Sequence, residues 1–237
     1  DDDDDDDDDD EYLIVGNDIG IAATREQIYN HAGKKRYLMV DDDITFYRRN
    51  RKYMKVESNM ERSKRPLSSS DWDDMFELFN GWMDEGLMHV GCRDSNLIPS
   101  EKFYHEFQYV SGAHFINGEE LSKWKDEVDW KFVKVAEDSI LNLECLLRGF
   151  KNRISDEFVC DIFGSMWTNE GGLENIRSPQ VHYEENIKLM NNPRYKPYTY
   201  IKKKIEIKNY GVIDVFKHRF KEAYNSSKYI NKLEEFK

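Results

Sequence analysis

The stretch GIAATREQIYNHAGKKRYLMVDDDITF, residues 20–46, decides the fold. Its first part predicts a helix that ends at Gly33, because glycine readily adopts the left-handed conformation that closes many helices. The run RYLMV at 36–40 predicts a strand, and EYLIV at 11–15 predicts another. Two strands joined by a helix of about three turns predict a parallel βαβ unit.

Apolar segments and helical patterns alternate along the rest of the chain. A helix that starts near Ser70 carries its large apolar side chains on one face and ends at Gly86. A second helix is expected to stop at Gly149. Strands are expected at 87–92, on both sides of a glycine turn within 106–118, at 157–163 and at 198–207, with helices at 179–192 and after 212. This order predicts an α/β fold with a mostly parallel central sheet flanked by helices, and with C-terminal helices.

The chain has 237 residues, 39% of them apolar, which suffices for the core of one domain. We assign residues 11–237 to that domain, with a helical extension over about 208–237. Residues 1–10 are all aspartate, repel one another, and are interpreted as a disordered tag or placeholder. The rest of the chain carries 35 basic against 37 acidic residues, so its balance of −2 neither favours nor excludes nucleic acid.

Three cysteines, Cys92, Cys145 and Cys160, lack CxxC spacing. They predict a reducing, cytoplasmic compartment and argue against a disulfide framework or a zinc site. No apolar run approaches the roughly 18 residues of a bilayer span, so no membrane partner is expected.

Asp41, Asp42 and Asp43 follow directly on the strand at 36–40. In open α/β sheets ligands bind beyond the carboxyl ends of the strands, where this triplet is expected to lie. Crowded carboxylates repel one another unless a cation neutralises them, and oxygen ligands suit Mg²⁺ or Mn²⁺ better than zinc. Taken alone, the triplet is equally consistent with an acidic turn that holds no metal.

The helix, the strand and the triplet together resemble the donor-binding core of the GT-A nucleotide-sugar glycosyltransferases. In that family a small residue and an arginine open a helix, the helix ends with alanine and glycine, and the next strand ends in Asp-x-Asp. The matching residues are Thr24 with Arg25, Ala32 with Gly33, and Asp41 with Asp43. Arg25 precedes Asp41 by 16 residues, the interval that the family has.

The resemblance continues downstream, to about residue 185. Gly112 in VSGAHFING matches the family's glycine-bearing segment, Ala136-Glu137-Asp138 matches its x-Glu-Asp motif, and His182 matches its late metal-binding histidine. The form DDDI followed by a basic segment is most similar to the TET-associated glycosyltransferases of bacteriophages, which implies the host cytoplasm. The chain has little room for the family's first nucleotide-binding strand and helix, so the base and ribose pocket is not assigned.

The resemblance implies a GT-A-like, Rossmann-like fold and a hexosyl- or pentosyltransferase that uses Mn²⁺ or Mg²⁺ and a nucleotide-sugar donor, a UDP-sugar first. The metal would stabilise the negative charge that grows on the leaving diphosphate. Asp43 is the first choice as its direct ligand, and Asp41 would face the ribose or a metal-bound water. The implied donor-binding residues are Arg25, Thr24, Asp41, Asp42 and Gly112, and the implied metal ligands are Asp41, Asp43 and His182.

Asp138, with Glu137 as the alternative, is the expected catalytic base. At a helix N-terminus the macrodipole favours the ionised carboxylate, which can take the acceptor's hydroxyl proton. A base on the face opposite the leaving group implies inversion at the anomeric carbon. Acidic residues in a first helical turn also stabilise the helix by themselves, and this alternative stays open. So do a surface position for Arg25 and an ordinary structural role for His182, His89 and His114.

The segment from Arg48 to Arg65 carries eight basic and two acidic residues, a charge of +6. Arginine and lysine bind DNA phosphates, and interleaved aromatic side chains stack on bases. DNA that contains hydroxymethylated pyrimidine is therefore the expected acceptor. Its expected contacts are Arg48, Arg49, Arg51, Lys52 and Lys55. The alternative is a solvated basic loop.

Other functions compete with this interpretation. The same donor chemistry could serve a glycan, lipid-linked or small-molecule acceptor. A catalytically silent glycosyltransferase-like module could bind DNA or a protein partner. A metal-dependent phosphoryl-transfer enzyme ranks last, because the sequence contains no P-loop.

Overall fold

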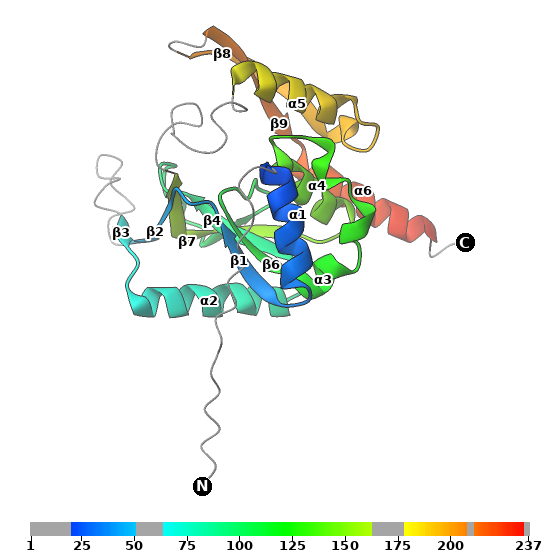
Figure 1. The fold of residues 1–237 in the computed structure, drawn as a ribbon. Helices are drawn as coiled ribbons and strands as arrows, with labels where there is room; N and C mark the ends of the chain where they lie inside the picture. Colours follow the sequence, from blue (N-terminus) through cyan, green and yellow to red (C-terminus); the bar gives the residue numbers. More distant parts are fainter. Residues whose placement is uncertain (1–19, 51–63, 163–177, 208–210, 235–237) are drawn as a thin grey trace.

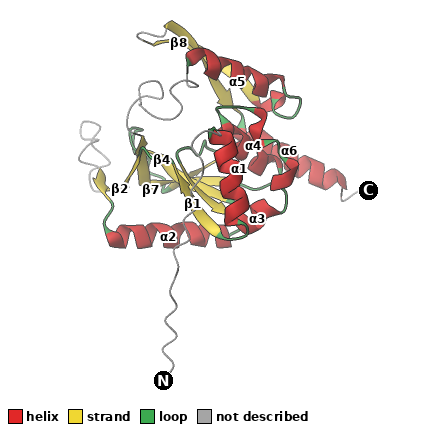
Figure 2. Cartoon of the chain, in the orientation of Figure 1, coloured by secondary structure: helices red, strands yellow, loops and turns green. Residues whose placement is uncertain are grey.

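The structure is a computed structural model that describes residues 20–50, 64–162, 178–207 and 211–234. A seven-stranded sheet has helices on both faces, and a two-stranded sheet lies towards one end of the molecule (Figure 1). Figure 2 shows the same view by element type. The strand predicted at 11–15 and the aspartates at 1–10 lie outside the described residues.

The stretch that decides the fold forms the two predicted elements, helix α1 (Ile21–Ala32) and strand β1 (Arg36–Val40). Gly33 follows the helix with φ of 57°, a backbone conformation that glycine adopts at little cost. Arg25 and Tyr29 of α1 are buried, so the helix sends a charged side chain into the protein interior.

The described strands of the large sheet run in the order β1-β6-β4-β7-β2-β3, and β5 pairs with β7 beside this path. β7 is the longest strand and contacts three others, β4, β2 and β5. The remaining strands are β2 (Ile44–Arg49), β3 (Lys64–Pro66), β4 (His89–Asp94), β5 (Tyr104–Glu106), β6 (Ala113–Asn117) and β7 (Asn152–Ile162).

The prediction of a mostly parallel sheet is wrong. Among the described strands only β4 and β7 pair in parallel, and the other pairs of the large sheet are antiparallel. Apolar residues on both sides of a strand report burial on both faces, which a central strand of either direction has. The pattern therefore carried no information about strand direction. β1 and β4 do run the same way, because each pairs antiparallel with β6.

Two apolar clusters cover the two faces of the sheet. On one face α2 (Ser69–Asp84) packs Met75, Phe79 and Trp82 against Phe46 and Phe115. On the other face lie α1, α3 (Gly118–Ser122), α4 (Glu137–Leu147) and α6 (Phe220–Glu234), as Figure 1 shows. Burying large apolar side chains contributes about 1.5–3 kcal/mol each, so these clusters hold the helices in place.

The predicted apolar face of α2 is confirmed apart from one residue, since Phe76 is 40% exposed. Ser68 caps the helix, and its side chain accepts from the backbone N–H of Asp71.

The C-terminal part contains α5 (Pro179–Asn191), β8 (Thr199–Ile207), β9 (Gly211–His218) and α6. The predicted helix at 179–192 and strand at 198–207 are confirmed. The prediction of helices directly after 212 is wrong at its start, because β9 pairs with β8 before α6 begins. Among the described helices, none has the length and apolar character that a bilayer crossing requires. Short 3₁₀ turns occur at Lys125–Glu127, Trp130–Phe132 and Lys196–Tyr198.

Candidate functional site

The first wall of the candidate site is formed where β1 ends and β6 begins. Val40 pairs with Ala113, and the backbone N–H of Asp41 donates to the carbonyl of Gly112 at 2.9 Å. Gly112 has φ of 71°, which explains why a glycine precedes β6. The predicted association of Gly112 with the acidic triplet is therefore a backbone contact with Asp41.

The start of α1 supplies Thr24 and Arg25. The hydroxyl of Thr24 donates to the carbonyl of Gly20 at 3.1 Å, so this side chain closes the first helical turn. Arg25 points the other way, into the protein, and its side chain is 4% exposed. Arg25 is thus not a surface arginine.

Arg25 joins three separate parts of the chain. Its Nη2 lies 3.0 Å from Oδ1 of Asp41, and its Nη1 lies 3.2 Å from Oε1 of Glu137. Nη1 also forms an ion pair with Oδ1 of Asp138. The helix arginine, one aspartate of the triplet and the acidic pair of α4 therefore meet in one cluster.

Glu137 and Asp138 stand in the first turn of α4, as predicted. Ala136 before them has φ of 70°, a left-handed conformation that costs a residue with a Cβ about 1–2 kcal/mol. Asn142, fully buried in α4, donates to the carbonyls of Val110 and Asp138, each at 2.8 Å. Its Oδ1 accepts from the N–H of Val110 at 3.1 Å. Asn142 thereby ties the turn before β6 to the start of α4.

His114 of β6 completes the cluster. Its Nε2 lies 3.1 Å from Oδ1 of Asp138 and 3.4 Å from Nη1 of Arg25. Its Nδ1 lies 3.0 Å from Nε2 of His89 in β4. Both histidines are 0% exposed.

Burial and charge set the protonation of the cluster. Burial, reinforced by Arg25, lowers the pKa of His89 to about 3 and that of His114 well below its ordinary value, so both rings are neutral. Burial would lower the pKa of Arg25, but the carboxylates of Glu137 and Asp41 outweigh it, and the pKa is raised. Burial raises the pKa of Asp41, and Arg25 opposes this rise. Ionised, the three carboxylates exceed the single guanidinium, so the cluster is acidic.

The other two aspartates of the triplet lie in the turn between β1 and β2, where Asp42 is exposed and Asp43 is half-buried. In the described part of the chain, no three His, Cys, Asp or Glu side chains are arranged to hold a metal by themselves. Mg²⁺ commonly binds through one or two carboxylates and the phosphates of a substrate, and such a site needs no larger group. The oxygen-only donor set of Asp41 and Asp43 fits this kind of ion.

His182 lies on α5, where its Nδ1 is 3.5 Å from the side-chain amide of Asn186. One turn further along, buried Glu185 accepts from the backbone N–H of Lys134 at 2.6 Å. Lys134 stands three residues before Glu137, so α5 is docked on the loop that leads to the acidic pair. This places His182 on a helix fixed to the site's second wall.

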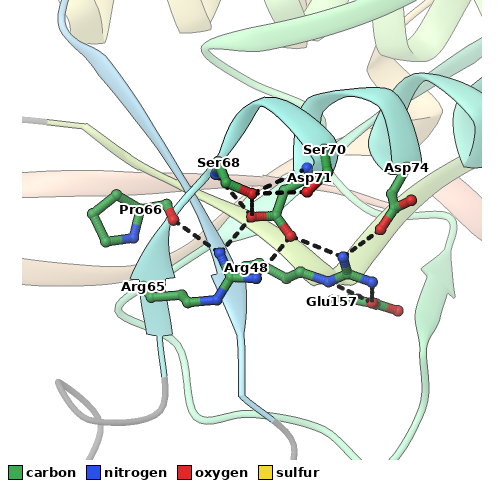
Figure 3. A network of polar contacts seen from close by, with 8 residues as sticks. All are labelled: Arg48, Arg65, Pro66, Ser68, Ser70, Asp71, Asp74 and Glu157. Atoms are coloured by element: carbon green, nitrogen blue, oxygen red, sulfur yellow. Dashed lines mark hydrogen bonds and ion pairs between the residues drawn. The ribbon is translucent and has the colours of Figure 1, made fainter.

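Of the predicted DNA contacts, Arg48 and Arg49 are described, and Arg51, Lys52 and Lys55 lie outside the described residues. Arg48 binds Asp71 and Asp74 of α2 at 2.8 and 2.5 Å and Glu157 of β7 at 2.7 Å (Figure 3). Arg49 is buried on the opposite face of β2 and donates to the carbonyl of Leu97 at 2.8 Å. Both guanidinium groups are engaged within the protein.

Arg65 of β3 joins the same network, because it binds Asp71 at the capped start of α2 (Figure 3). Asp71 also accepts from the backbone and the hydroxyl of Ser68, at 2.8 and 2.6 Å. Part of the positive charge in the basic segment therefore fixes the β2–β3 pair to α2.

The sequence analysis missed two contributors to the cluster, the His89–His114 pair and Asn142. A signal was present, because each of these polar residues interrupts an apolar run: MHV, AHF and LNL. A polar side chain inside such a run has to be buried and hydrogen-bonded.

The chain was compared with family models, with curated proteins and with solved structures, and none of them matches.

Proposed function

We propose that the protein is a divalent-metal-dependent glycosyltransferase that moves a sugar from a nucleotide sugar to a hydroxyl acceptor. The observation that carries the proposal is the ion cluster around Arg25. Three motifs chosen from the sequence for this chemistry, 16 to more than 100 residues apart, supply side chains to it. An accidental acidic turn at Asp41 would have no reason to meet Asp138.

The chemistry of the residues agrees with such a reaction. A Mn²⁺ or Mg²⁺ ion held by Asp43 and Asp41 would stabilise the charge that develops on the leaving diphosphate. Arg25 adds a fixed positive charge beside Asp41, where donor phosphates would lie. Asp138 would take the proton of the acceptor hydroxyl as it attacks the anomeric carbon.

A thermal-shift screen of nucleotide sugars, with and without Mn²⁺, tests the donor and the metal together. A donor present at 100 times its Kd stabilises the native state by about 2.7 kcal/mol. We expect this shift with a UDP-sugar only when Mn²⁺ is present, and we expect Asp43→Asn to abolish it. Asp73→Asn, an exposed change on α2, serves as the matched control. The absence of any metal-dependent shift across the nucleotide sugars would reject the proposal.

The acceptor that we propose is hydroxymethylated pyrimidine in DNA. Because Arg48 and Arg49 are engaged in internal contacts, the support comes from Arg51, Lys52 and Lys55 in the sequence and from the exposed lysines of β8, Lys202, Lys203 and Lys204. Release of nucleotide diphosphate should rise with hydroxymethylcytosine DNA and stay unchanged with plain DNA. A rise with a glycan or a small alcohol instead would assign a different acceptor.

A catalytically silent DNA- or partner-binding module is the second candidate. It is favoured by the ion pair of Asp138 with Arg25, which has to loosen before the carboxylate can act as a base. This candidate predicts DNA binding without sugar transfer from any donor.

A further inference from the structure

A row of two buried histidines stands behind Asp138. His89 lies opposite Ile116 and His114 lies opposite Gly91, so the two rings are diagonal neighbours on one face of the β4–β6 pair. The rings are almost parallel, at 7°, and their centroids are 5.2 Å apart. The row runs from Nε2 of His89 to Nδ1 of His114, and from Nε2 of His114 to the carboxylate of Asp138.

Only one proton can lie between the two rings, and its position decides the rest. If His89 carries it on Nε2, His114 accepts it at Nδ1 and has its own proton on Nε2, directed at Asp138. If His114 carries it on Nδ1, the lone pair of its Nε2 faces the carboxylate oxygen at 3.1 Å, which is repulsive. His89 would then have its proton on Nδ1, which is buried and has no hydrogen-bond partner in the described structure. A buried unpaired N–H is costlier than an unpaired lone pair.

We propose that His114, held by His89, is a positioning residue that donates its Nε2–H to the carboxylate of Asp138 and so fixes the base for attack. This inference deepens the proposed function and rests on it for the role of Asp138. Held in this way, one carboxylate oxygen accepts from the imidazole and the other is available for the acceptor hydroxyl.

The proton balance follows from the same arrangement. As the acceptor oxygen bonds to the anomeric carbon, its O–H bond breaks and the proton moves to Asp138. The electron pair of the carbon–oxygen bond to the diphosphate leaves with the diphosphate. His114 cannot take the proton further, because its Nε2 already carries one and its Nδ1 is occupied by the N–H of His89. The proton therefore stays on Asp138 until solvent or product release removes it.

Nitrogen-15 NMR of the histidine rings tests the hydrogen-bond row without any substrate. In the wild-type protein at pH 6 to 8 we expect His89 and His114 to be neutral with the proton on Nε2. In Asp138→Ala we expect His114 to switch to the Nδ1–H form, because Nη1 of Arg25, at 3.4 Å, becomes the partner of Nε2. An Nδ1–H or doubly protonated His114 in the wild type would overturn the proposal, even if the variant fails to fold.

Kinetics test the positioning role. His114→Leu should lower kcat about 10–100-fold, the range for outer-shell partners, with the KM of the donor changed less than about twofold. His114→Gln, which keeps an N–H donor, should recover most of the loss. Equal losses in both variants, at equal thermal stability, would reduce His114 to a packing role. If the wild type transfers no sugar from any donor, the proposed function fails, whereas the NMR result still decides the hydrogen-bond row.

Discussion

Nη2 of Arg25 lies 3.0 Å from Oδ1 of Asp41, so the helix arginine and the first aspartate of the triplet form a direct ion pair. The same guanidinium contacts Glu137 and Asp138, which makes Arg25 the link between the end of β1 and the start of α4. Its charge is buried, and its value to the fold therefore depends on keeping all of these partners.

Replacing Arg25 by methionine should lower the free energy of unfolding by about 3–5 kcal/mol, because it leaves buried carboxylates without their partner. Urea unfolding followed by circular dichroism measures the change. Arg36→Met is the matched control. Arg36 is 38% exposed and pairs with the more exposed Asp84, so its loss should cost less than about 1 kcal/mol. Equal effects of the two changes would contradict the central role of Arg25.

Asp138→Asn should abolish sugar transfer, with a loss of about 10²–10⁴-fold in kcat, and leave the affinity for the donor with Mn²⁺ nearly unchanged. The reason is that the amide cannot accept a proton at neutral pH. Parallel assays of diphosphate release and of donor binding measure the two properties. Asp126→Asn, at an exposed position, controls for charge. Transfer at a near-normal rate by Asp138→Asn would exclude Asp138 as the base.

Asn142→Leu should lower the free energy of unfolding by about 2–3 kcal/mol, because the backbone N–H and carbonyl of Val110 would lose their buried partners. The same change should raise the hydrogen-exchange rate of the Asp41 amide, since the turn before β6 would no longer be held to α4. The hydrogen-exchange measurement separates this local loosening from global destabilisation. Unchanged protection of Asp41 would mean that Asn142 does not hold the turn.

Asp71→Asn should destabilise the protein by about 2–3 kcal/mol at pH 7, because the carboxylate accepts from Arg65, Arg48 and Ser68. Arg65 and Arg48 hold the pKa of Asp71 far below its ordinary value, and burial opposes them. Its charge therefore stabilises the folded state at every pH above the ordinary aspartate pKa of about 3.9, and this stabilisation is lost as the pH falls below that value.

Urea unfolding at pH 7 and pH 3 measures this loss, and the gap between wild type and Asp71→Asn should narrow at pH 3. Asp74→Asn, which removes a half-exposed partner of Arg48, should cost less than about 1 kcal/mol. A gap that stays constant with pH would show that the ion pairs contribute nothing.

The buried histidines predict a loss of stability in mild acid. The pKa of His89 is lowered to about 3 by burial and by Arg25, whereas an unfolded histidine titrates near about 6.5. Below pH 6.5 the unfolded state binds the extra proton, so stability falls by about 1.4 kcal/mol per pH unit for this group until the pH reaches about 3. His89→Gln should reduce the slope of stability against pH between 6 and 4 by that amount. An unchanged slope would mean that His89 is charged in the folded state.

The sequence by itself determined the local elements that carry the site. Residues 21–33 and 36–40 have patterns that only neighbouring residues set, and they form α1 and β1 as predicted. The acidic pair at the start of α4 follows from the same local rules. The stretch also fixed the interval between Arg25 and Asp41, which the structure closes into an ion pair.

Only the tertiary structure decided the direction of the strands, because a residue's burial is the same in a parallel and in an antiparallel sheet. It also decided the role of His114, which is 89 residues from Arg25 along the chain and hydrogen-bond distance from it in space. Local periodicity has no term for such contacts. They arise where the sheet and the helices α1 and α4 pack together, and that packing leaves a buried arginine whose charge every nearby carboxylate has to satisfy.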